Sequence, residues 1–295
     1  AGMKGEMLPA LEWLGTGSRR CVRILGLRDI IDDPIAVKAL WEEQRTYELL
    51  EKHYDTILIY GPQEIFDSAQ AYGMSEALCK RIHYCGYIGE SEMHVRSEGA
   101  GSTPAPRSVV VTIGGGDGAT EVVSTYLEMI RRFRERVDFE SHVVTGPFVD
   151  DETFARIERL AHTLGVRLDR FVPSTSPLFA QCDLVIATGG YNTMTQILGH
   201  ARRALVIPRV LYREEQLLRA TLLARAGWIQ MMPPEELTPE RLFDQVISQL
   251  SDSHESVTEA RKRRPDLLTG AQNVVRIIAA SLHEFMSNPG VRHNQ

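Results

Sequence analysis

The stretch Ser108-Val-Val-Val-Thr-Ile113-Gly-Gly-Gly-Asp-Gly118-Ala119 decides the fold of this chain. Residues 108–113 are mostly β-branched and apolar, which is typical of a buried β-strand. The glycines that follow allow a tight turn, and residues 119–135 then have the pattern of a helix. A strand that ends in a glycine-rich loop and leads into a helix predicts an α/β protein with a parallel sheet.

The same alternation continues toward the C-terminus. We expect further strands at residues 141–145, 167–171, 184–187, 204–207 and 228–231, and helices at residues 152–164, 177–181, 192–200, 214–226 and 239–250. Such a series predicts a doubly wound parallel sheet. A second glycine loop, Thr188-Gly-Gly-Tyr-Asn192, lies between one of these strands and its helix.

The alternation also continues toward the N-terminus. Strands are expected at residues 21–27, 56–60 and, more weakly, 82–87, with helices at residues 33–53 and 64–72. Asp33-Pro34 supplies an N-cap followed by a proline at the first helical position. Trp41 and Trp228 are predicted to lie in the core.

The domain organisation follows from a break in this pattern. Residues 98–106 are small, polar and rich in proline and glycine, which predicts a linker. We therefore expect a partial N-terminal domain at 1–90, a linker at 91–106, a second domain at 107–268 and a final helix within 269–289. The apolar stripe of that helix comprises Val274, Ile277, Ile278, Leu282 and Phe285.

Composition excludes several classes of protein. The chain has 295 residues, a formal net charge of -6, 43% hydrophobic and 24% charged residues, as expected for a soluble globular protein. The sequence has no basic tract for nucleic acid, no apolar run of about 18 to 20 residues for a membrane span, and no signal peptide. The four cysteines show no zinc spacing. We expect free thiols and a cytoplasmic location.

The two glycine loops are the predicted ligand site. Glycines let the backbone approach a ligand, and helix N-termini favour phosphate. The first loop also fits the dinucleotide pattern, but an NAD site needs an acid at the end of the next strand. Here that strand ends in Thr145-Gly146-Pro147, so NAD ranks low.

The motifs on these loops resemble those of GT-B fold glycosyltransferases, particularly family 28. The matching residues are the stretches 114–119, 171–173 and 188–197, together with Pro208 and the segment Glu214-Glu215-Gln216-x-x-Arg219-Ala220. In the N-terminal part, Gly26-Leu-Arg-Asp29 and the stretch from Tyr54-Asp55 to Tyr60-Gly61 match a group of predicted glycosyltransferases. The resemblance implies two Rossmann-like doubly wound domains: an acceptor-side N-terminal domain that is incomplete here, and a nucleotide-sugar-binding domain at 107–268. It also implies that the C-terminal helix, within 269–289, packs back on the N-terminal domain.

The resemblance also implies which residues bind the donor. These are Gly115, Gly116, Asp117, Gly118, Phe171, Val172, Gly189, Gly190, Tyr191, Asn192, Thr193, Gln196, Glu215, Gln216 and Arg219. The family has a glutamate on the helix of the second loop that accepts hydrogen bonds from the ribose. This chain has Gln196 there, which keeps one acceptor but loses the charge. The catalytic base stays unassigned, because the glycine loop and base that open the family's N-terminal domain are not found before Cys21.

The function implied by the resemblance is metal-independent transfer of a sugar from a nucleotide sugar, a UDP-sugar, to an acceptor that the sequence does not identify. No cofactor is expected. The sequence does not indicate an oligomeric state, and peripheral contact with a membrane is compatible with it. Two alternatives stay open: a donor-binding subunit whose catalytic base comes from a partner, and a UDP-sugar epimerase.

Overall fold

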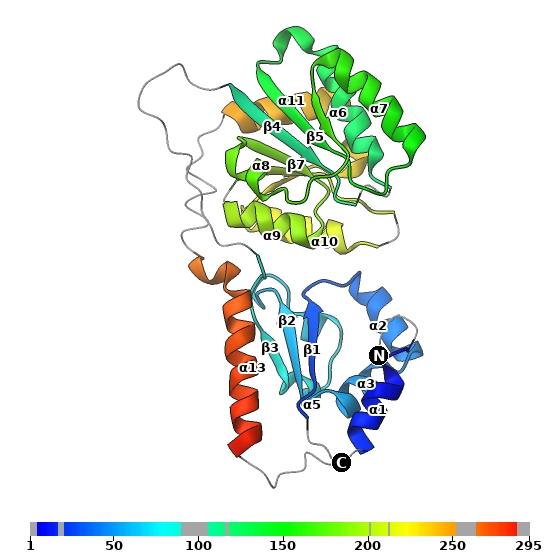
Figure 1. Ribbon diagram of the computed structural model, residues 1–295, viewed down its shortest axis with the longest axis vertical. Coiled ribbons are helices and arrows are strands. Elements are labelled where there is room, and N and C mark those ends of the chain that lie inside the picture. The colour runs from blue at the N-terminus through cyan, green and yellow to red at the C-terminus, as the bar shows by residue number, and fades with distance from the viewer. Residues whose placement is uncertain are drawn as a thin grey trace. The chain divides into compact units, whose positions relative to one another are not determined.

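The chain forms two compact α/β units in the computed structural model, which describes residues 5–16, 21–89, 106–115, 118–200, 202–211, 213–251 and 264–287 (Figure 1). One unit comprises Ala1–Ile88 and Asp266–Gln295, and the other Gly89–Pro265. The strands of both units pair in parallel, which confirms the predicted α/β class. The expected linker, residues 91–106, lies outside the described residues apart from Pro106.

The second unit contains a six-stranded sheet in the order β6-β5-β4-β7-β8-β9. Its strands are β4 (Arg107–Thr112), β5 (Phe139–Val144), β6 (Arg167–Asp169), β7 (Leu184–Ala187), β8 (Arg203–Val206) and β9 (Gln230–Met231). The chain moves outward from β4 to β6, returns to β7 beside β4, and then moves outward on the other side. This is the predicted doubly wound order, with its switch point between β4 and β7.

Helices cover both faces of this sheet. They are α6 (Thr120–Arg132), α7 (Asp151–Leu164), α8 (Ser176–Gln181), α9 (Tyr191–His200), α10 (Glu215–Arg225) and α11 (Pro239–Ser251), with 3-10 turns at Arg134–Arg136 and Pro234–Glu236. Side chains of α6, α7 and α11 form one core with β4, β5, β7 and β8. Helix α8 packs on α9 and β4, and α10 on β9. Trp228 is buried in this unit, as predicted.

The first unit contains a three-stranded sheet in the order β1-β2-β3. Its elements are β1 (Ile24–Arg28), β2 (Thr56–Tyr60), β3 (Ile82–Tyr84), α1 (Leu8–Thr16), α2 (Pro34–Glu43), α3 (Thr46–His53), α4 (Ser68–Ala71), α5 (Glu76–Cys79) and α13 (Gly270–Ser287), with a 3-10 turn at Pro265–Leu268 before α13. Trp41 lies in the core of this unit, as predicted.

The helix predicted at residues 33–53 is two helices. Asp33 caps α2 as expected, since its carboxylate accepts hydrogen bonds from the backbone of Ile35 and Ala36. The helix ends at Glu43 because Arg45 adopts a left-handed conformation with φ of 54°, and α3 then begins at Thr46.

Two other predictions for this unit were wrong in detail. The helix predicted at residues 64–72 is only the single turn α4, which begins after its N-cap Asp67. Helices α1 and α5 were not predicted. The short α5 begins where the Ser75 hydroxyl caps the backbone N–H of Leu78.

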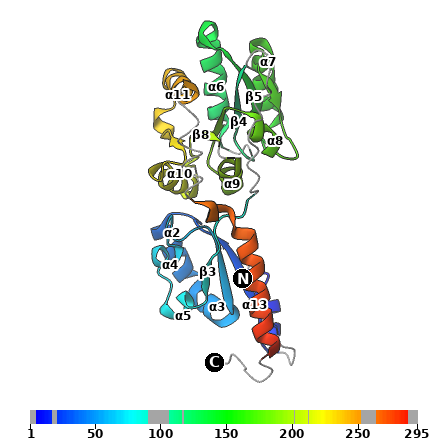
Figure 2. The ribbon, with the colours of Figure 1, turned by 90° about the vertical axis from the view of Figure 1, so that its left-hand side faces the viewer.

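The final helix, α13, belongs to the first compact unit and lies beside β3 in both views (Figures 1 and 2). Asn273 donates a hydrogen bond from Nδ2 to the carbonyl of Cys85, directly after β3, at 2.8 Å. The predicted stripe is half-buried except for Leu282, which is 47% exposed. The neighbouring Ser281 is half-buried instead, so the inner face is displaced at this turn.

Candidate functional site

The two glycine loops lie at the switch point of the six-stranded sheet. Glycine loop 1 (residues 114–118) follows β4, and glycine loop 2 (residues 188–192) follows β7 and includes the start of α9. These strands are direct neighbours, with Thr112 opposite Ala187 in the ladder. Helix α6, which begins after loop 1, has no side-chain cap. No side-chain cap therefore competes with an anion for the N-terminus of α6, beside the switch point.

Loop 1 is supported by the chain that leaves β5. The backbone N–H of Phe148 donates to the carbonyl of Gly115 at 2.9 Å. Gly146 has φ of +91°, and a Cβ atom there would lie 2.2 Å from the carbonyl oxygen of Gly114. The residue after Thr145 must therefore be a glycine for loop 1 to keep its path.

Loop 2 is supported from below by α10. Arg219 is only 1% exposed, and its Nη1 donates to the carbonyl of Gly189 at 3.4 Å. Its guanidinium carbon lies 5.6 Å from the centre of the Tyr191 ring. Gln216 is also buried, and its Oε1 accepts from the backbone N–H of Arg209 at 3.2 Å. Both side chains thus lie behind loop 2.

Gln196 lies on α9 and is half-buried. Its Oε1 accepts a hydrogen bond from the hydroxyl of Thr175 at 2.6 Å. One turn further along α9, Nε2 of His200 lies 2.7 Å from the hydroxyl of Ser176. The side chain of His200 therefore connects α9 to α8.

The remaining predicted residues differ in exposure. Phe171 is 63% exposed, and Asn192 is also exposed, whereas Val172, Thr193 and Glu215 are half-buried. Gly116 and Asp117 lie outside the described residues. The predicted donor-binding residues that the structure describes lie on segments that follow the carboxyl ends of β4, β6, β7 and β8.

Sequence reasoning missed several residues that shape this site, namely Gly146, Phe148, Thr175, Ser176 and Arg209. The side chain of Arg209 lies beside loop 1, since its Cδ is 3.7 Å from the position of a Cβ on Gly118. Gly146 directly follows the strand predicted at residues 141–145, and a glycine at such a position indicates a close backbone approach. The sequence offered no comparable signal for the others.

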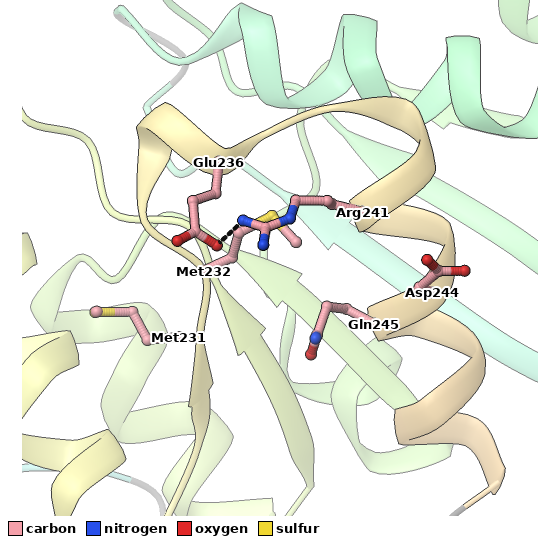
Figure 3. Close-up of a pocket in the computed structure, with 6 residues that line it drawn as sticks. All are labelled: Met231, Met232, Glu236, Arg241, Asp244 and Gln245. Atoms are coloured by element: carbon pink, nitrogen blue, oxygen red, sulfur yellow. Dashed lines mark hydrogen bonds and ion pairs between the residues drawn. The ribbon is translucent and has the colours of Figure 1, made fainter.

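A pocket of about 280 Å³ lies elsewhere, at the carboxyl end of the edge strand β9 (Figure 3). Its lining residues are Met231, Met232, Glu236, Arg241, Asp244 and Gln245. Glu236 and Arg241 point toward each other and form an ion pair. None of the predicted donor-binding residues lines this pocket, so we do not include it in the candidate site.

The described residues contain no group of three or more His, Cys, Asp or Glu side chains placed to hold a metal ion. No helix among them is long and apolar enough to cross a membrane.

Comparisons with known proteins agree with this architecture. Residues 109–275 match the family model of the glycosyltransferase family 28 C-terminal domain. A relative from Mannheimia succiniciproducens is 24% identical over 169 residues, which are 57% of this chain and 47% of the relative. It is named UDP-N-acetylglucosamine–N-acetylmuramyl-(pentapeptide) pyrophosphoryl-undecaprenol N-acetylglucosamine transferase. The chain thus spans about half of that relative's length.

Solved glycosyltransferase structures share the fold. The glycotransferase of kitacinnamycin aligns with a TM-score of 0.55 at 18% identity, covering 92% of this chain and 65% of its own. MurG of Acinetobacter baumannii aligns with a TM-score of 0.51 at 16% identity, covering 84% and 77%. These likenesses confirm the predicted GT-B fold. Since the family match covers more than half of the sequence, this chain belongs to glycosyltransferase family 28 through its C-terminal domain.

Proposed function

We propose that this chain transfers a sugar from a UDP-sugar donor to an acceptor hydroxyl. The observation that carries the proposal is the position of both glycine loops at the switch point between β4 and β7. In open parallel sheets, ligands bind outside the carboxyl ends of the strands at this point. The name of the Mannheimia relative supports a uridine nucleotide sugar as the donor.

The donor-binding residues in this proposal surround that point. We propose that the diphosphate is bound by backbone N–H groups of loop 1, at Gly115, Gly116, Asp117 and Gly118, and of loop 2, at Gly189, Gly190, Tyr191, Asn192 and Thr193; Gly116 and Asp117 are assigned from the sequence alone. Phe171 and Val172 contact the base, Gln196 lies near the ribose, and Glu215 lies near the sugar. Gln216 and Arg219 contribute by supporting loop 2, because both side chains are buried next to it.

The proposed chemistry requires charge stabilisation at the loops. The acceptor oxygen forms a bond to the anomeric carbon, while the bond from that carbon to the diphosphate oxygen breaks. The diphosphate leaves with the bonding electrons and gains negative charge. Backbone N–H groups and helix N-termini that are already oriented stabilise such charge without reorganisation. The acceptor gives its proton to a base that we leave unassigned.

We propose further that this charge stabilisation needs no metal ion. Loop 1 opens α6, loop 2 opens α9, and the buried Arg219 lies directly behind loop 2. The two helix N-termini place partial positive charge near the diphosphate, and Arg219 places a full positive charge there. Transfer should therefore continue in excess EDTA, and loss of transfer in EDTA with recovery on adding Mg²⁺ would refute this point.

Calorimetric titration of UDP into the protein tests the donor site. We expect saturable binding, stronger for UDP than for uridine, because the loops contact the diphosphate. If millimolar UDP neither binds nor changes the melting temperature, the proposal is wrong.

A second candidate is a donor-binding subunit, because none of the described residues is assigned as the catalytic base. Release of UDP from a UDP-sugar distinguishes the two functions, provided that acceptors of several classes are offered. UDP binding without any release would support the subunit. Conversion of the sugar into its epimer without an acceptor would support an epimerase instead.

A further inference from the structure

Two side-chain hydrogen bonds fasten the start of α8 to α9. The Thr175 hydroxyl donates to Oε1 of Gln196 at 2.6 Å, and the Ser176 hydroxyl lies 2.7 Å from Nε2 of His200. Gln196 and His200 are four residues apart, so they share one face of α9. Two consecutive residues of one segment are therefore held by two successive turns of a single helix.

The other end of this segment is held by the main chain. The backbone N–H of Thr145 donates to the carbonyl of Asp169 at 3.1 Å, and that of Gly146 to the carbonyl of Arg170 at 2.8 Å. Residues 171–174 lie between these two anchors. Phe171, Pro173 and Ser174 are exposed and Val172 is half-buried, so little of this segment is fixed by burial. Its conformation therefore depends on its two ends.

The acceptor atom of Gln196 is already in use. The family resemblance implies that this side chain accepts from the ribose, but here its Oε1 binds Thr175. An amide oxygen has two lone pairs, so the bond to Thr175 leaves at most one acceptor position for a ligand. In the structure this oxygen holds Thr175.

We propose that Gln196 and His200 are positioning residues that determine which base the nucleotide site accepts. They fix Thr175 and Ser176, and thereby hold residues 171–174 in the conformation that recognises the base. This inference rests on the proposed function, because it assumes a nucleotide beside segment 171–174. It predicts that loss of either bond reduces selectivity for the base while binding of the diphosphate is kept.

The test compares Thr175→Val, which has a similar shape but no hydroxyl, with Thr175→Ser, which keeps the hydroxyl. Calorimetry measures the Kd of UDP, GDP and inorganic pyrophosphate for each protein. Thr175→Val should raise the Kd of UDP by about twofold to tenfold, the range that corresponds to the loss of one neutral hydrogen bond. Pyrophosphate affinity should stay unchanged, so the ratio of the GDP Kd to the UDP Kd should fall. Thr175→Ser should restore the wild-type ratio.

Two variants of Gln196 extend the test. Gln196→Glu keeps an acceptor for Thr175 and should keep the preference for UDP over GDP, whereas Gln196→Ala should lose it. Thr175→Val combined with Gln196→Ala should change the ratio of GDP to UDP affinity no more than Gln196→Ala alone, because both changes remove the same bond. Thr163→Val is the matched control, since it removes a threonine hydroxyl bond on the remote helix α7.

Four outcomes would overturn the inference. Equal losses of UDP and pyrophosphate affinity in Thr175→Val would show a merely structural role for the bond. An unchanged ratio of GDP to UDP affinity would show that segment 171–174 does not read the base. A wild-type protein that binds pyrophosphate and both nucleotides equally would refute this inference but leave the diphosphate site intact. Failure to bind any of the three ligands would refute the proposed function as well.

Discussion

The exchange of Gly146 for alanine tests whether loop 1 depends on the chain that leaves β5. The new Cβ would lie 2.2 Å from the Gly114 carbonyl oxygen and 2.5 Å from the Gly115 carbonyl carbon. These neighbours are backbone atoms, so no side-chain rotation can relieve the clash. Either loop 1 or the end of β5 must move.

Gly165 provides a matched control. It lies at the C-cap of α7 with φ of +72°, and a Cβ there would meet no atom within 4 Å. Both substitutions therefore carry the cost of a left-handed alanine, about 1–2 kcal/mol. Only Gly146→Ala adds overpacking, which typically costs about 1–3 kcal/mol.

The expected effects on stability and binding differ. For a domain of 150–250 residues, 1 kcal/mol corresponds to about 2–4 °C in Tm. Gly165→Ala should therefore lower the Tm of its unit by about 2–8 °C, and Gly146→Ala by more. A hydrogen bond to a charged group contributes about 1.5–3 kcal/mol. In Gly146→Ala only, loop 1 should be displaced and lose one such bond, which should weaken UDP binding about tenfold to hundredfold.

Calorimetric titration of UDP, well below the Tm of both variants, gives the decisive comparison. We expect Gly165→Ala to bind UDP like the wild type. If the two variants bind UDP equally well, either loop 1 does not contact the nucleotide or Gly146 does not support it.

Three further predictions concern the first unit. Asp33→Ala should lower the free energy of unfolding of this unit by about 0.5–2 kcal/mol, because α2 loses its N-cap. Asp33→Asn keeps a capping oxygen and should cost little. Urea denaturation measures both variants. Trp41→Ala should lower the free energy of unfolding by about 3–5 kcal/mol in the same assay, because this ring packs against Tyr47 and Tyr72 in the core. A loss below about 1 kcal/mol would contradict its place in the core. Burial, assisted by nearby positive charge, lowers the pKa of His53 below its ordinary 6.5, so stability should be full above pH 6.5 and fall as the pH falls through the lowered pKa. Denaturation curves from pH 7.5 to 5 should show this loss, and His53→Gln should flatten it.

The strand-and-helix order of the second unit could be read from the sequence. Apolar runs such as residues 108–113 and 184–187 are bounded by glycine loops, and those loops open helices with a clear apolar face. The structure has β4, β7, α6 and α9 at these places. The pattern is readable because strand, turn and helix signals agree locally.

The break between α2 and α3 could not be read in the same way. Residues 33–53 carry apolar residues at helical spacing without a glycine or proline after Pro34. The break occurs at Arg45, which adopts a left-handed conformation that its residue type does not favour. It lets Trp41 and Tyr47 meet edge to face at 5.5 Å. Tertiary packing therefore overrides the local signal here.

The contacts behind the glycine loops were equally hidden from the sequence. The resemblance places Arg219 at the donor site, but arginine is a residue type that is rarely buried, and nothing in its neighbours predicts 1% exposure. Thr175 and Gln196 are far apart along the chain, and they meet only because α8 packs on α9.

The supports of the two loops show why a site built largely from backbone can be selective for its ligand. Glycine loops bind anions through N–H groups, yet glycine is also the residue that loses most freedom on ordering. Gly114 and Gly115 of loop 1 are contacted by Gly146 and Phe148, which follow β5, and Gly189 of loop 2 is contacted by Arg219 of α10. These supports come from elements on opposite sides of the switch point, so the contacted parts of both loops are held before a ligand arrives. A binding site that is ordered in advance does not have to spend binding energy on ordering itself. We therefore expect the residues that support the loops to matter to nucleotide affinity as much as the glycines that would touch the phosphates.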